Sequence, residues 1–211
     1  MAKGANAYGI KEVADVSFYP ITAGEGFVYV TGATYDETTG KVTLTWSSGS
    51  GPKAEYNFDS LKISNIEVGS EEVSATGGRG NPELISWSYG KTVTLTVTDA
   101  LFSMDTLDLM FGGKENATAA SDVLTIDAKT FPGNYSIVGT AVIRNFETGN
   151  DEPFVFYMPK AHPQVGGTLT MEADGDPSTF EMTIKGLAQK CGDDEDVLIR
   201  FIRATKDTKG A

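Results

Sequence analysis

The sequence predicts a mainly β protein of antiparallel strands with one short flanking α-helix. Apolar and polar residues alternate over most segments, which is the period of a half-buried strand. Sequences rich in Gly, Asp, Asn and Pro separate these segments at close spacing, and a single segment has helical spacing instead. The two hairpin-rich parts of the chain fit two sheets of one sandwich.

A β-hairpin is predicted near the N-terminus. A strand at 27–30 leads into the turn sequence DETTG at 36–40, and Val42, Leu44 and Trp46 then alternate with threonines. SSGSGPK at 47–53 predicts a flexible loop, after which an apolar pattern resumes over 56–66.

The most regular alternation is TVTLTVT at 92–98. Val93, Leu95 and Val97 fall on one face and threonines fall on the other. The segment therefore predicts a strand with one buried face and one polar, uncharged face.

One helix is predicted within DALFSMDTLDLMFGG. Ser103 can cap its N-terminus, Asp105 lies in the first turn where it favours the helix dipole, and Gly112 or Gly113 can end it. The spacing places three apolar side chains on one face: Met104, Leu107 and Phe111.

The second half of the chain predicts further strands. We interpret KENATAAS at 114–121 as a loop and FETGNDEPF at 146–154 as a turn. Strands are expected at 123–126, 136–144 and 153–158, a hairpin at 168–185 across the turn ADGDPS, and a strand buried on both faces at 197–202, after the acidic run at 192–196.

Composition argues against several functions. The chain has 29 acidic and 17 basic side chains and a net charge of -12, which opposes binding to DNA phosphates. Cys191 is the single cysteine and cannot form an intramolecular disulfide, and the lone His162 precedes Pro163 in what we expect to be a polar loop. With no signal-peptide pattern and no apolar run of membrane-helix length, a cytoplasmic origin is expected.

No catalytic, cofactor or metal site is predicted. The glycines of TGGRGNPELISWSYG at 76–90 suggest a phosphate loop, but β-type residues follow them where a helix would be needed. Asp174 and Asp176 do not follow the EF-hand order, so a turn is favoured over calcium binding. Trp46 and Trp87 could stack sugars, but we interpret both as core aromatics.

Three stretches together resemble the tail tube (major tail) proteins of tailed bacteriophages: KEVADVSFYP, the central LKISNIEVGSEEVSATGGRGNPELISWSYGKTVTLTVTDALFSMDTLDLMFG, and MEADGDPSTFEMTIKGL. The resemblance covers about two thirds of the chain. It implies a β-sandwich or rolled barrel, with subunits that form stacked hexameric rings around a bore through which DNA passes. It also implies contacts with the tape measure and terminator proteins, and a place in the virion tail after synthesis in the host cytoplasm.

On this interpretation, residues 1–211 form one domain with long assembly loops at about 31–60 and 67–91. The second loop would supply a subunit interface formed by Arg79, Asn81, Pro82 and Trp87, with Arg79 facing an acid on a neighbour. Polar strand faces would line the bore, with candidates Thr94, Thr96, Thr170, Glu172, Glu181 and Thr183.

Other functions remain open at this point. A capsid decoration or tail terminator protein would be equally β-rich and differ in its oligomer geometry. A carbohydrate-binding or adhesin sandwich would need a row of exposed aromatics, and an enzyme would need a cleft with perturbed carboxylates.

Overall fold

The computed structural model describes residues 8–21, 26–59, 61–99, 103–118, 121–166 and 180–207, and 61% of it is strand. The sheets are antiparallel except where the two-residue strand β15 (Thr205–Lys206) runs parallel to β2 (Val30–Tyr35). The described residues contain a single short helix. The predicted mainly β fold is confirmed.

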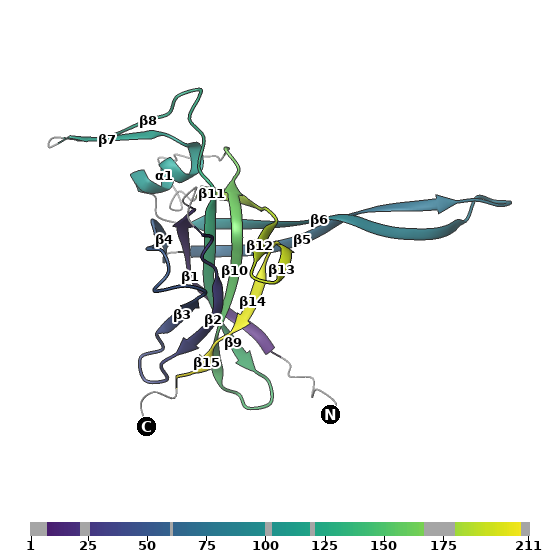
Figure 1. Cartoon of the computed structure of the whole chain (residues 1–211), viewed down its shortest axis with the longest axis horizontal. Helices are drawn as coiled ribbons and strands as arrows, with labels where there is room; N and C mark the ends of the chain where they lie inside the picture. The colour runs from purple at the N-terminus through teal and green to yellow at the C-terminus, as the bar shows by residue number, and fades with distance from the viewer. Residues whose placement is uncertain are drawn as a thin grey trace, which may run out of the picture.

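The body is built on one large sheet (Figure 1). Its strand order is β4-β1-β9-β10-β11-β6-β5, and β14 joins it by pairing with β10. The sheet curls so that β1 and β5, which do not pair, approach each other. Its strands are β1 (Tyr8–Pro20), β4 (Tyr56–Phe58), β5 (Leu61–Thr76), β6 (Glu83–Asp99), β9 (Tyr135–Asn145), β10 (Asp151–Pro163), β11 (Phe180–Gly186) and β14 (Arg200–Arg203).

Two apolar cores lie on opposite sides of this sheet, because paired strands send alternate side chains to each face. The first core includes Val16, Phe18, Leu95, Met158 and Ile184, all fully buried. The second is smaller, and β2 covers it. Its buried members are Val30, Ala33, Val138, Val155, Tyr157 and Ala204.

The helix α1 (Met104–Phe111) forms where the sequence predicts it. Ser103 caps it and Gly112, at φ 64, ends it. The expected buried face is wrong, because the buried side chains are Thr106, Leu109 and Met110, while Met104, Leu107 and Phe111 lie at the margins of that face. The 3.6-residue period fixes the width of the buried face, but packing on the sheet decides its centre.

Asp108 fastens the end of α1 to its surroundings. Its side chain accepts hydrogen bonds from the Tyr56 hydroxyl at 3.1 Å and from the backbone N–H of Gly113 at 2.8 Å. Burial, followed by the nearby Tyr135 and Asp108, raises the pKa of Tyr56.

The N-terminal hairpin is confirmed, with its strands at β2 and β3 (Val42–Trp46), but its first strand covers Val30–Tyr35 rather than the expected 27–30. Asp36 forms the turn by accepting hydrogen bonds from the backbone N–H groups of Thr38 and Thr39, at 2.7 and 3.0 Å. Residues 31–60, expected as a long loop, contain β2, β3 and β4 as well as the loop at 47–53. Trp46 is partly buried against the second core, as expected.

Three further differences concern later segments. Within the segment expected as a loop at 114–121, the described residues belong to paired strands, β7 (Lys114–Thr118) and the start of β8 (Ser121–Thr125). The run at 197–202 is divided between β13 (Asp194–Val197), which pairs with β12 (Gln189–Cys191), and β14, and Phe201 is 53% exposed. His162 lies within β10 rather than in a loop. The first strand expected in the hairpin at 168–185, and the pair Asp174 and Asp176, lie outside the described residues.

Candidate assembly surfaces

The segment expected as a long loop at 67–91 is a β-hairpin. β5 and β6 pair from Leu61↔Asp99 to Thr76↔Glu83, and only 77–82 form the turn. The paired strands leave the body as a long two-stranded ribbon (Figure 1). We call residues 71–89 the arm. The prediction of a loop was wrong because the glycines around Arg79 shape only the turn at 77–82. The residues on either side of that turn keep the alternation of a strand.

The turn at the end of the arm explains these glycines. Gly78 and Gly80 have φ of 85 and 91, which side chains disfavour, and Asn81 has φ 52. The turn is closed by hydrogen bonds from Gly77 N–H to the Pro82 carbonyl and from Asn81 N–H to the Gly78 carbonyl, both 3.1 Å. Arg79 is exposed in this turn, and a strand follows rather than a helix.

The arm has one apolar face and one polar face. Val73 pairs with Trp87 and Ala75 with Ile85, so these four side chains share a face. At the proximal end Glu71 pairs with Tyr89 on the same face. The opposite face carries Glu72, Ser74, Ser86 and Ser88.

The apolar face is open to solvent. Ile85 is 62% exposed, Trp87 52% and Tyr89 49%. The expectation that Trp87 is a core aromatic was therefore wrong. We define the apolar arm face as Glu71, Val73, Ala75, Ile85, Trp87 and Tyr89.

A β-bulge separates the arm from the body. Between Gly69↔Thr92 and Glu71↔Tyr89, β6 contributes Gly90 and Lys91 where β5 contributes one residue, and Gly90 has φ 61. On β5, Ile66 faces the first core, whereas Val73, an odd number of residues later, faces the other side. The apolar arm face therefore does not continue the core of its own subunit.

Polar contacts tie the two strands of the arm together. The hydroxyl of Tyr89 donates to Glu71, and this hydrogen bond, followed by burial, raises the pKa of Tyr89. On the opposite face Ser86 donates to Glu72. The structure therefore places Trp87 along the ribbon and Arg79, Asn81 and Pro82 in its turn, so the four predicted interface residues lie on one arm.

The predicted polar strand face is assembled from β6 and β11. Thr96 pairs with Thr183, and Glu181 pairs with Thr98. These residues alternate with buried ones on both strands, so Thr94, Thr96, Glu181 and Thr183 share one face. Register also brings Lys185 and, from β5, Asn65 and Glu67 to this face, which the sequence analysis missed. Thr170 and Glu172 lie outside the described residues.

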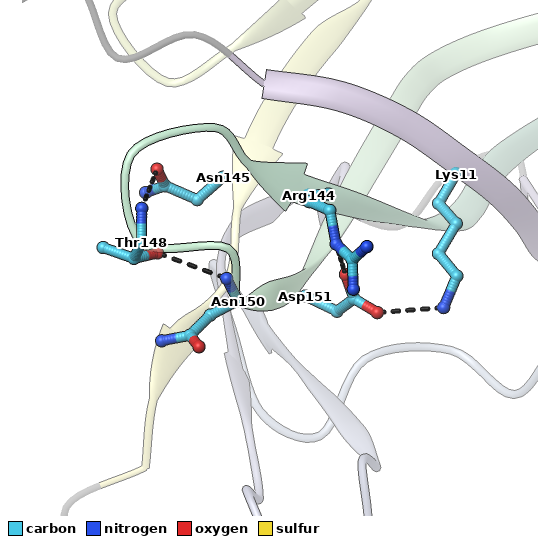
Figure 2. A network of polar contacts seen from close by, with 6 residues as sticks. All are labelled: Lys11, Arg144, Asn145, Thr148, Asn150 and Asp151. Carbon is cyan, nitrogen blue, oxygen red and sulfur yellow. Dashed lines mark hydrogen bonds and ion pairs between the residues drawn. The ribbon is translucent and has the colours of Figure 1, made fainter.

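A network of polar contacts lies at the hairpin end of β9 and β10 (Figure 2). Asp151 accepts from Lys11 Nζ and from Arg144 Nε, both at 2.9 Å. The hydrogen bond from Lys11, and then that from Arg144, holds the pKa of Asp151 below its usual range. Phe146, in the adjoining turn, is 83% exposed. We call Lys11, Arg144, Phe146 and Asp151 the β9–β10 tip.

Asn145 shapes the turn beside this tip. Its side-chain oxygen accepts from the backbone N–H groups of Glu147 and Thr148, at 2.9 and 3.2 Å. The Thr148 hydroxyl in turn accepts from the N–H of Asn150 at 3.4 Å (Figure 2). These bonds hold Phe146 in an ordered turn rather than a loose loop.

An open pocket of about 480 Å³ lies beside β1 and the loop at 47–53. Its lining has no acidic, basic or sulfur-containing side chain: Pro20, Ile21, Gly26, Phe27, Val28, Ser48, Gly49, Ser50, Gly51, Pro52, Ser136 and Gln189. Such a lining offers no group for proton transfer at neutral pH.

Other chemical sites are not evident in the part of the chain that the structure describes. No group of three or more His, Cys, Asp or Glu side chains among these residues could hold a metal ion. Burial raises the pKa of the Cys191 thiol, which disfavours the reactive thiolate. Within the same residues, no helix is long and apolar enough to cross a membrane.

Comparison with known proteins gives one family. The model of the YomU/Tube protein family matches residues 50–117 and 113–201, well over half of the chain. The matched ranges include the arm, α1, β9 and β10. No characterised protein matches the chain significantly.

Proposed function

We propose that the chain, which belongs to the YomU/Tube family of phage tail tube proteins, assembles into stacked hexameric rings that form a hollow conduit for DNA ejection. The family gives the chain a structural role in the virion tail. Ring formation, stacking and passage of DNA are our inference.

The apolar arm face is the observation that carries this proposal. A two-stranded ribbon is at best marginally stable alone in water. Here it exposes Ile85, Trp87 and Tyr89 on one side, although both cores of the body are complete without them. An exposed aromatic face of this kind is typical of a protein interface. We infer that neighbouring subunits cover it, and that Arg79 meets an acid there.

The negative charge of the chain supports a bore through which DNA passes. At a net charge of -12, a ring of these subunits repels DNA phosphates, so DNA would slide without sticking. The face that carries Thr94, Thr96, Glu181 and Thr183 lies on paired strands, and its charged side chains, Glu67, Glu181 and Lys185, leave it without excess positive charge, which suits a wall that DNA slides past. We assign this face to the bore, together with Thr170 and Glu172 of the same polar alternation.

The remaining contacts follow from this arrangement. A tube needs a defined start and end, so we expect tape measure and terminator proteins to bind the exposed rings. We treat residues 1–211 as a single domain that supplies both the wall and the arm.

The experiment compares the two faces of the arm. One variant carries Ile85→Ser and Trp87→Ser, and its matched control carries Ser86→Asn and Ser88→Asn on the opposite face. Electron microscopy and light scattering over a concentration series should show rings or tubes for the wild type and the control, and monomers for the first variant. Cleavage by trypsin after Arg79 should be fast in monomers and slow in tubes.

Two results would contradict the proposal. A wild-type protein that remains monomeric at every concentration would argue against self-assembly into rings. Normal tubes from the Ile85→Ser, Trp87→Ser variant would show that the arm face is not a contact.

A further inference from the structure

We propose that the apolar arm face binds the β9–β10 tip of a second copy of this chain, and that Glu71 pairs there with Arg144 and Lys11. This inference rests on the proposed function, since it names the surface that receives the arm.

Glu71 limits which partner surfaces can cover the apolar arm face. It is the one charged side chain of the apolar arm face, and its carboxylate already accepts from Tyr89. One hydrogen bond does not compensate a carboxylate for leaving water, so a partner that buries this face must also supply a cation. A purely apolar partner would not fit.

The β9–β10 tip supplies both kinds of group. Phe146 is the most exposed large apolar side chain of the described residues. Lys11 and Arg144 share the single carboxylate of Asp151, and their side chains are 50% and 60% exposed. Even with Glu147 of the adjoining turn, the tip is neutral in a chain of net charge -12. An approaching acid therefore meets two cations there rather than net repulsion.

The two surfaces cannot meet within one subunit. Figure 1 shows the arm extending sideways from the body, while the β9–β10 hairpin ends at the lower edge, far from the arm. Contact between the arm and the tip must therefore join two different copies. The resulting pair still has one unbound arm and one unbound tip. Such a head-to-tail contact propagates, as stacked or ring-forming subunits require.

The first test is a charge swap. Glu71→Arg alone and Arg144→Glu alone should each raise the protein concentration needed for assembly by about tenfold or more, which is the effect of losing one close charge pair. The variant with both changes should return to within about threefold of wild type. Glu72→Arg, on the opposite face, is the matched control and should not be rescued by Arg144→Glu.

Thermal unfolding of each variant shows whether the fold is intact, because Arg144→Glu also removes a partner of Asp151. A second measurement does not depend on charge. Val73→Cys combined with Phe146→Cys should give a ladder of disulfide-linked multimers on oxidation, whereas Ser74→Cys with Phe146→Cys should not. The native Cys191 is buried and should not interfere.

The outcomes separate the two proposals. Suppose that the wild type assembles, that the variant with both Glu71→Arg and Arg144→Glu is not rescued, and that Val73→Cys with Phe146→Cys gives no disulfide ladder. This result would overturn the inference, but the proposal of tube formation would still stand.

Lys129 is an exposed cation two residues from Phe131, which is 65% exposed. If Lys129→Glu rescued Glu71→Arg and Arg144→Glu did not, the receiving surface would lie beside Phe131 and this inference would also be overturned. A wild type that never assembles would count against the proposed function itself.

Discussion

Single residues set how tightly the sheet packs, and Gly139 is the sharpest case. It pairs directly with Phe156 across β9 and β10, and a Cβ at this position would lie 2.0 Å from the Phe156 ring. Phe156 is 3% exposed and belongs to the first core, so its ring has little room to move. Gly139→Ala should therefore lower the free energy of unfolding by about 1–3 kcal/mol through overpacking. Urea denaturation measures this change.

Gly32 provides the matched control. It also lies within a strand, β2, but a Cβ there would meet Thr45 at 3.9 Å, an ordinary contact. Gly32→Ala should leave stability unchanged or raise it slightly, because alanine has less freedom in the unfolded chain. Equal losses in the two variants would show that packing against Phe156 is not the cause.

At the scale of elements, α1 depends on its cap. The Ser103 hydroxyl accepts from the backbone N–H of Thr106 at 3.2 Å, and the Thr106 hydroxyl accepts from the N–H of Ser103 at 3.4 Å. Because Thr106 is 6% exposed, water cannot readily replace this pair. Ser103→Ala should cost about 1 kcal/mol of unfolding free energy. Ser103→Asp should retain most of the stability, and equal stability of the Ala variant and wild type would contradict the role of the cap.

The same helix shows what sequence can predict about elements. Its ends were predicted correctly because Ser103 and Gly112 act through neighbouring backbone groups. The turn at Asp36 and the buried face of Val93, Leu95 and Val97 were predicted correctly for the same reason: each depends on local chemistry or a local period.

What failed depends on contacts between distant segments. The strand expected at 197–202 divides because Leu198 and Ile199 turn to pack on the first core. The arm was interpreted as a loop, and Trp87 as buried, because alternation shows that a side chain shares a face but not whether anything covers that face. The alternation of Ile85, Trp87 and Tyr89 with serines was the available signal for an apolar ribbon.

At the scale of the whole molecule, the two cores share a sensitivity to alkaline pH. Burial raises the pKa of Tyr56 and Tyr135 beside the first core and of Tyr19 beside the second. It raises the pKa of Tyr157 to about 12. In the unfolded chain these tyrosines ionise near their reference pKa of about 10, so above that pH the unfolded state holds fewer protons than the folded state.

From neutral pH upward, stability should therefore be nearly constant to about pH 9 and should fall as pH rises from about 10 toward 12. Tyr157 alone contributes a loss of about 2–3 kcal/mol over that range, since each unit of pKa difference corresponds to about 1.4 kcal/mol. Urea unfolding at a series of pH values measures the loss, and Tyr157→Phe should make the fall less steep by removing one of the ionising groups. If stability stayed level to about pH 12, the buried hydroxyls would have to ionise as easily in the folded protein as in the unfolded chain, and both cores would have to admit water.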